Sequence, residues 1–81
     1  MAVDRFGEKL IGLRRGRGWT LEVLAGRLGY RSRGYLSEVE SGKKRPSLEL
    51  VLSVSRLFGV PTDALLKDEL EVEVSPGEGE P

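Results

Sequence analysis

The sequence contains no cysteine and no histidine, and each absence narrows the chemistry open to the protein. Without cysteine there are no disulfides and no thiolate zinc sites, and without histidine the commonest metal ligand and general base are missing. We therefore expect no metal, no cofactor and no enzymatic activity. No apolar run exceeds three residues, as in Leu50 to Leu52, and the N-terminus carries Asp4 and no signal-like block. The sequence thus predicts a cytoplasmic protein that does not enter a membrane.

The net charge of the 81 residues is zero, but positive and negative side chains are unevenly distributed along the chain. Residues 1–60 contain twelve Lys or Arg against six Asp or Glu, a charge of +6, whereas residues 61–81 contain one against seven, a charge of −6. A basic body with an acidic tail indicates nucleic-acid contact at the basic end. Solvated helices with alternating charges, followed by an ordinary acidic tail, would give the same distribution.

Apolar residues at helical spacing, together with capping residues, divide residues 4–67 into five helices and predict an all-α single domain. The expected helices are about 4–15, 21–28, a third of about nine residues before Gly42, 48–58 and 62–67. Two glycines, Gly7 and Gly12, weaken the first helix unless they admit a close neighbour. The expected N-caps are Asp4, Thr20, Ser32 and Ser47, and Trp19 is expected to staple the second helix by packing on Leu24.

Residues 68–81, "DELEVEVSPGEGEP", differ in character from the domain at 1–67 and form an acidic tail. Glu and Val alternate from Glu71 to Val74, which fits a half-exposed strand that pairs with its twin in a dimer. The Pro, Gly and Glu content of the tail favours disorder, because four alternating residues are a weak periodicity signal. Both descriptions of this segment stay open.

The second and third helices and their short connection match the helix-turn-helix pattern. In this motif one buried helix supports a second helix whose exposed face can enter a DNA major groove. The third helix is polar over most of its surface, and the cationic loop "GKKRP" follows it directly. The sequence therefore predicts a domain that contacts DNA.

Two longer stretches carry a family resemblance: "FGEKLIGLRRGRG" from Phe6, and "WTLEVLAGRLGYRSRGYLSEVESGKKRPSLELVLSVSRLFGVPTDALL" from Trp19. They contain "LR" at 13–14, "T...LA" at 20–25, "LG" at 28–29, "LS.VE.G" at 36–42, "PSLE" at 46–49 and "FGV" at 58–60. Together these elements resemble the five-helix DNA-binding domain of the phage lambda repressor and Cro group, the Xre family. The resemblance implies a transcriptional regulator of repressor or controller type that binds double-stranded DNA and is associated with the nucleoid.

The resemblance also assigns roles to individual residues. In the third helix Leu36, Ser37 and Val39 are implied to look inward. Arg33 suits guanine and Glu38 suits cytosine, although Arg33 could grip a phosphate and Tyr35 could simply cover the edge of the core. The implied base-reading residues are Ser32, Arg33, Gly34, Tyr35 and Glu38. The implied phosphate-binding residues are Arg17, Thr20, Arg31, Lys43, Lys44 and Arg45, of which the run 43–45 could instead be only a solvated charge run.

Two departures from the family pattern concern the helix-turn-helix itself. The family usually places glutamine after the Thr20 position, where it braces a phosphate, and here Leu21 takes its place. The turn "YRSR" is one residue longer than the common pattern, so Gly34 is either a flexible opening to the third helix or a point of close approach to DNA.

The resemblance pairs Arg14 with Glu40 in a salt bridge that joins the first and third helices; a loose surface pair is the alternative. A homodimer is also expected, binding near-palindromic operators. In the fourth helix the core stripe is expected to be Leu48, Val51, Leu52, Ser55 and Phe58. The residues left over, which are expected to form the dimer interface, are Leu50, Leu57, Val60, Leu65 and Leu66.

Two other functions fit the same residues. An antitoxin would bind DNA and also mask a protein partner, a toxin, through its acidic tail. A protein-interaction module would keep the fold without binding DNA, for which Leu21 and Gly34 are the indications.

Overall fold

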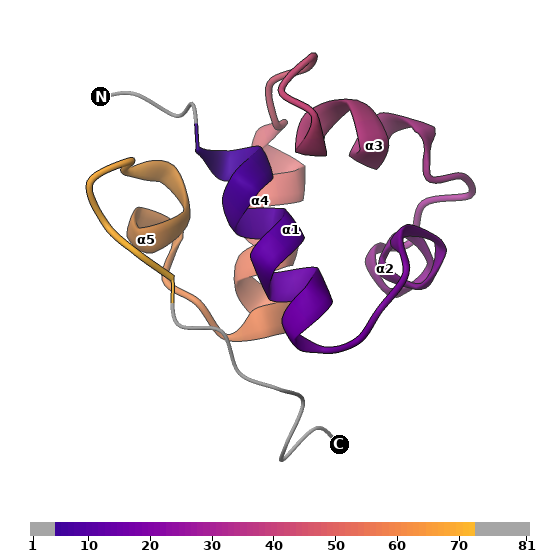
Figure 1. The fold of residues 1–81 in the computed structure, drawn as a ribbon, viewed down its shortest axis with the longest axis horizontal. Helices are drawn as coiled ribbons and strands as arrows, with labels where there is room; N and C mark the ends of the chain where they lie inside the picture. The colour runs from indigo at the N-terminus through magenta and orange to yellow at the C-terminus, as the bar shows by residue number, and fades with distance from the viewer. Residues whose placement is uncertain (1–4, 73–81) are drawn as a thin grey trace.

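The computed structural model describes residues 5–72, which contain five α-helices and no strand (Figure 1). The all-α five-helix fold predicted from the sequence is confirmed. On one side of α1 and α4 lie α2 and α3, and on the other side lies α5 (Figure 1). None of these five helices has the length and apolar character needed to cross a membrane. The bounds are α1 Phe6–Gly16, α2 Leu21–Leu28, α3 Gly34–Glu40, α4 Leu48–Phe58 and α5 Thr62–Leu66.

Local capping chemistry fixes the ends of α2 and α4. The Thr20 hydroxyl accepts a hydrogen bond from the Val23 amide at 3.2 Å, and the Ser47 hydroxyl accepts one from the Leu50 amide at 3.1 Å. Each helix ends on a glycine with a positive φ, +86° and +66°, which side chains with a Cβ rarely adopt. Both helices therefore have the bounds that the sequence predicts.

The starts of α1 and α3 differ from the expected ones. Arg5 occupies the N-cap position of α1, and Asp4, the expected cap, lies outside the described residues. The first residue of α3 is Gly34, after Arg33 at the N-cap position with no side-chain cap. Ser32 is therefore not the cap, because the longer turn takes it up, and α3 has seven residues rather than nine.

The inward face of α4 is rotated about the helix axis from the expected one, because only Val51 and Phe58 of the expected stripe are buried. Leu50 is fully buried, while Leu48 is 73% and Leu52 38% exposed. Three of the residues assigned to a dimer interface, Leu50, Val60 and Leu65, therefore belong to the core, and that assignment is wrong for them. The physical reason is that α4 packs against α2 and α5 along the line of Leu50, Val51, Val54 and Phe58. Leu57 and Leu66 are half-buried against the same core.

A close approach between α1 and α3 depends on Gly7. A Cβ at this position would lie 2.7 Å from the Glu40 carbonyl oxygen and closer still to that of Val39. Both distances are well below van der Waals contact, so only glycine lets the end of α3 rest directly on α1. This is the close neighbour that the sequence allows for at Gly7.

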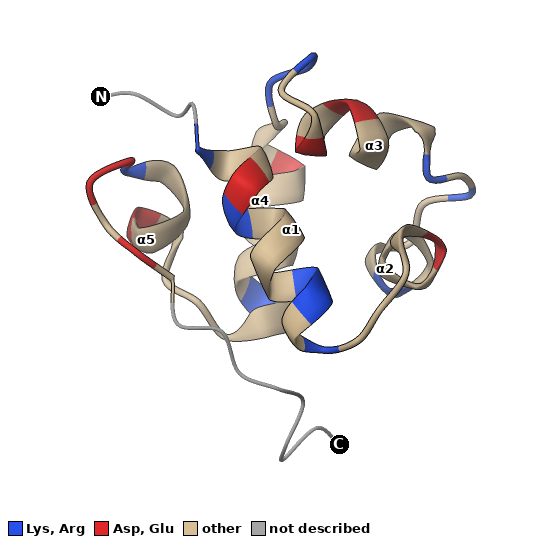
Figure 2. Ribbon diagram, viewed as in Figure 1, with Lys and Arg blue, Asp and Glu red and all other residues tan. Residues whose placement is uncertain are grey.

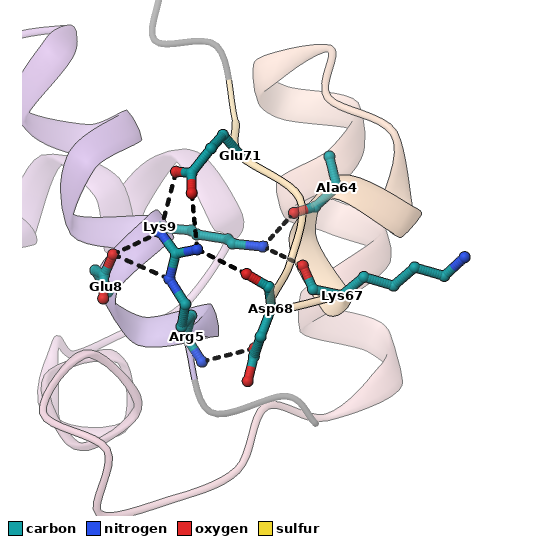
Figure 3. Close-up of polar contacts among 7 residues, drawn as sticks. All are labelled: Arg5, Glu8, Lys9, Ala64, Lys67, Asp68 and Glu71. Atoms are coloured by element: carbon teal, nitrogen blue, oxygen red, sulfur yellow. Dashed lines mark hydrogen bonds and ion pairs between the residues drawn. The ribbon is translucent and has the colours of Figure 1, made fainter. Parts of the chain in front are cut away.

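A group of polar contacts, here called the α1–α5 clamp, ties the start of α1 to the chain after α5 (Figure 3). Lys9 is 3% exposed, and its Nζ donates to the carbonyl oxygens of Ala64 at 2.6 Å and Lys67 at 2.7 Å. These are carbonyls of the last turn of α5, where a positive charge also complements the helix dipole. Lys9 therefore caps α5 with its side chain.

The second component of the clamp is Arg5. Its guanidinium donates to both carboxylate oxygens of Glu71 at 2.9 and 3.0 Å, and to the Asp68 carbonyl oxygen at 2.7 Å. The backbone N–H of Arg5 donates to the Asp68 carboxylate at 3.0 Å. The hydrogen bonds to Glu71, together with those to Glu8, raise the pKa of Arg5, and the bonds from Arg5 lower the pKa of Glu71. The first residues of the expected acidic tail are thus attached to the domain.

The alternating segment is described only in part. Glu71 and Val72 are not in a strand, and Val72 packs on the core. The remaining residues, 73 and 74, lie outside the described part, as does the rest of the tail.

Candidate nucleic-acid interface

The short helix α3 has a buried face and an exposed one. Leu36 and Val39 enter the core, whereas Ser32, Arg33 and Gly34 are exposed. Ser37, which was expected to point inward, is also exposed. It lies on the outward face because it is one residue from Leu36 and two from Val39, positions that a helical period places about 100° and 200° away. The sequence could have identified Ser37 by this period alone.

The pair expected between α1 and α3 is present as a two-bond contact. Arg14 donates from Nε and from a terminal nitrogen to the two Glu40 oxygens, at 2.9 and 3.1 Å. The side chains are only 13% and 7% exposed, so this is not a loose surface pair. The guanidinium also donates to the Trp19 carbonyl oxygen at 3.0 Å. Arg14 thereby fixes the end of α3 and the approach to α2 from a single position on α1.

The contacts of Tyr35 favour a role at the edge of the core. Its hydroxyl accepts a hydrogen bond from the Ser47 amide at 2.9 Å, which holds the start of α4. Its ring lies 5.6 Å from that of Tyr30, whose pKa is raised mainly by burial. The Lys44 ammonium lies 6.0 Å from the Tyr35 ring centroid, on the cationic loop.

The loop after α3 is attached to that helix by its backbone. The amides of Lys43 and Lys44 donate to the Glu38 carbonyl oxygen at 2.8 and 3.2 Å. The Lys44 ammonium also pairs with the Glu38 carboxylate at 3.2 Å, so Glu38 has an intramolecular partner. Lys43 and Arg45 are exposed, and their side chains have no polar partner within residues 5–72.

Positive charge therefore flanks α3 at both ends. Figure 2 shows blue segments in the turn between α2 and α3 and in the loop between α3 and α4. Arg31 and Arg33 lie in that turn, exposed and without a side-chain partner in the described part of the chain. Red segments lie on α3 itself and on the other four helices, and also on the chain that follows α5.

The residues before α2 are arranged around Trp19. Its ring lies 5.6 Å from that of Phe58 and packs against the core that contains Leu24. The Arg17 guanidinium sits 5.4 Å from the Trp19 ring and 5.0 Å from the Phe58 ring. Arg27, which drew no attention in the sequence, lies 4.7 Å from the same tryptophan ring. The Thr20 hydroxyl oxygen accepts the α2 cap bond, which leaves its hydrogen for donation.

A family model described as a helix-turn-helix domain matches residues 5–68. The HTH-type transcriptional activator BcrR of Enterococcus faecalis is 45% identical over 64 residues, which are 79% of this chain and 31% of that protein. The SPbeta prophage-derived uncharacterized HTH-type transcriptional regulator YonR of Bacillus subtilis is 39% identical over 62 residues, or 76% and 56% of the two chains. The HTH-type transcriptional regulator AnsR of Bacillus subtilis is 36% identical over 76 residues, or 94% and 61%.

The matched region is thus most of this chain but between 31% and 61% of each relative. The family match covers the part of the structure from Arg5, at the start of α1, to Asp68, after α5. Within it lie both helices of the motif and the turn between them. The chain belongs to the helix-turn-helix domain family.

Proposed function

We propose that the protein is a sequence-specific transcriptional regulator that inserts α3 into the major groove of double-stranded DNA. The observation that carries this proposal is the position of α3 between two cationic segments, with its inner face buried and its end tied to α1 by Arg14 and Glu40. A helix held this way presents a fixed polar face, as base reading requires. The names of the three relatives, all transcriptional regulators or activators, agree with this function.

Sequence reading falls to the exposed start and outer face of α3. Arg33 can donate two hydrogen bonds to guanine O6 and N7, an interaction that discriminates between bases by about 1 to 3 kcal/mol. Ser32 and Ser37 have hydroxyls that can bond to a base edge, and Gly34 lets the backbone come close. Glu38 accepts from cytosine N4 once it releases Lys44, which then turns toward the backbone of the DNA.

The cationic side chains on either side of α3 provide most of the affinity for DNA. The phosphates of one DNA strand are bound by Lys43, Lys44 and Arg45. Those of the other strand are bound by Arg31, Arg17 and the hydroxyl hydrogen of Thr20. Each neutralised phosphate contributes about −0.9 to the slope of log affinity against log salt concentration. Binding is therefore expected to weaken steeply as salt is raised.

The regulator acts as a homodimer on near-palindromic operators. A twofold axis places two copies of α3 about 34 Å apart, in successive major grooves on one face of the duplex. We assign it to the repressor or controller type, in which the dimer blocks a promoter. A reporter gene placed behind the selected operator tests this, since repression lowers its expression and activation raises it.

Selection of bound duplexes from a random pool tests the function. The expected product is an enriched, near-palindromic sequence, and no enrichment over a non-binding control protein would contradict the proposal. Two variants sharpen the result: Arg33→Ala should relax preference at one position of each half-site, whereas Lys43→Ala should weaken all sequences alike. Glu22→Ala, exposed on α2, is a matched control that should change neither.

A further inference from the structure

The outer face of α4 exposes two large apolar side chains along one line. Leu48 and Leu52 are four residues apart, so they lie on the same side of the helix, and they are 73% and 38% exposed. Both side chains stay exposed although residues 5–72 are folded around the rest of α4. Exposed leucines in line on a helix whose inner face is already filled are a feature of surfaces that bind another protein.

Two opposite charges border these leucines. Glu49 and Arg56 are exposed on the same outer face, seven residues or about 10 Å apart along the helix, and Leu52 lies between them. In the described part of the chain neither charge is paired in a salt bridge. The order along the helix is therefore negative, apolar, positive.

This order of charges on one copy is complementary to the same order on a second copy that runs in the opposite direction. When two such helices pack antiparallel about a twofold axis near Leu52, that leucine meets Leu52 of the partner subunit. Glu49 then faces Arg56 of the partner subunit, and the same ion pair recurs on the other side of the axis. A parallel arrangement would bring like charges together instead.

We propose that the outer face of α4 is the surface through which two copies of this chain dimerise, antiparallel across Leu52. The occupant is a second copy because the charges match only their own reverse. This surface replaces the interface that was expected around Leu50, Val60 and Leu65, because those three residues are buried in the core.

This dimer is compatible with the proposed function. The dimer surface is argued without reference to DNA, and only the consequence for DNA binding rests on the proposed function. Both α2 and α3 lie on one side of α4 (Figure 1). A twofold axis that crosses α4 and points toward that side leaves both copies of α3 facing the same way, as one duplex requires.

Charge reversal tests the surface. Sedimentation equilibrium should show a dimer for the parent chain, while Glu49→Arg and Arg56→Glu should each raise the dimer dissociation constant at least about tenfold. Combining the two reversals restores both ion pairs in the opposite sense and should return the constant to within about threefold of the parent. Glu22→Arg is the matched control on α2 and should have no effect. A monomeric parent chain, or a double variant as weak as the single ones, would overturn the proposal.

The apolar contact has its own test. Leu52→Asp should abolish the dimer, whereas Leu70→Asp, at a leucine that is 40% exposed beside the α1–α5 clamp, should leave it intact. Circular dichroism establishes that both variants are folded. An undiminished dimer in Leu52→Asp would refute the surface.

Half-site duplexes separate this inference from the proposed function. Monomeric variants should still bind one half-site while losing the gain in affinity that a full palindrome gives. If the chain dimerises through α4 but does not bind DNA, the proposed function is refuted and the dimer surface is supported. If the chain binds palindromic duplexes and the charge reversals do not change this binding, the proposed function is supported and the dimer surface is refuted.

Discussion

The Lys and Arg side chains on two sides of this domain differ in exposure and in the number of partners they contact. On the α2–α3 side, Arg31, Arg33, Lys43 and Arg45 are exposed, and within residues 5–72 their side chains have no partner. On the α1–α5 side, the side chains of Arg5 and Lys9 make seven hydrogen bonds with neighbouring groups, and Lys9 is buried. The comparison teaches that a count of charges says little, because the same side chains hold the protein together on one side and are available to a ligand on the other.

The difference follows from where backbone acceptors are left over. The buried ammonium of Lys9 donates to the Ala64 carbonyl in the last turn of α5 and to the Lys67 carbonyl just after it, which also accepts a bond from the Leu70 amide. In the loop after α3 the backbone amides of Gly42, Lys43 and Lys44 donate to carbonyls at the end of that helix, so this attachment uses no lysine or arginine side chain. The side chains of Lys43 and Lys44 therefore remain in solvent.

The largest effect is expected at the pair that connects the two sides. Glu40→Ala would leave the guanidinium of Arg14 buried with two of its three hydrogen bonds lost, at a cost of about 3 to 5 kcal/mol in the free energy of unfolding. Urea denaturation measures this loss. Replacing both residues by apolar ones, in Arg14→Met with Glu40→Leu, should recover most of it. A loss below about 1 kcal/mol would mean that the pair behaves as a surface contact.

The clamp should give the next largest effect. Lys9→Ala removes two charge-assisted hydrogen bonds and takes the Lys9 partner from the Ala64 carbonyl, while the Lys67 carbonyl keeps its bond from the Leu70 amide, so we expect a loss of about 2 to 3 kcal/mol. Lys67→Ala is the matched control, since that lysine has an exposed pair with Asp63 at 3.9 Å and should change stability by less than about 0.5 kcal/mol. Equal losses in the two variants would erase the contrast between buried and exposed cations.

The cationic loop should show the reverse pattern. Lys43→Ala combined with Arg45→Ala should leave the free energy of unfolding within about 0.5 kcal/mol of the parent, because neither side chain has a partner to lose. The salt dependence of DNA binding should become shallower by about 0.9 for each phosphate contact removed. Titrations at several salt concentrations measure the slope, and a destabilised but salt-insensitive variant would break the comparison between the two sides.

The smallest effect concerns the exposed end of the clamp. Hydrogen bonds from Arg5 lower the pKa of Glu71, so the folded state favours its charged form. The resulting stabilisation is present above the ordinary carboxylate pKa of about 4.3 and is lost as the pH falls through the lowered value. The melting temperatures of the parent and of Glu71→Gln should therefore differ slightly at neutral pH and converge in acid. A difference that grows in acid would contradict this assignment.

Helix bounds could be predicted where local chemistry sets them. Thr20 and Ser47 cap their helices with their own hydroxyls, and Gly29 and Gly59 end the helices with a left-handed backbone. These signals involve residues close together in sequence, so they survive without knowledge of packing. The start of α3 lacks such a signal, because no side chain caps it.

Faces were harder to predict than bounds. Leu48, Leu50 and Leu52 alternate along α4, so the sequence supports two inward faces, and only packing against α2 and α5 decides between them. Lys9 was missed because a lysine in an amphipathic helix is normally placed on the surface. Yet it follows Phe6 by three residues and precedes Leu13 by four, which puts it on the buried stripe.

The clamp also determines where any continuation of the chain begins. Arg5 and Lys9 hold residues 64–71 on the side of the molecule opposite α3 (Figure 1). A second module joined after Val72 would therefore start away from α3. A pull on such a tether would load the hydrogen bonds of Arg5 and the first turn of α1 before it reached α3, the helix that we propose reads DNA.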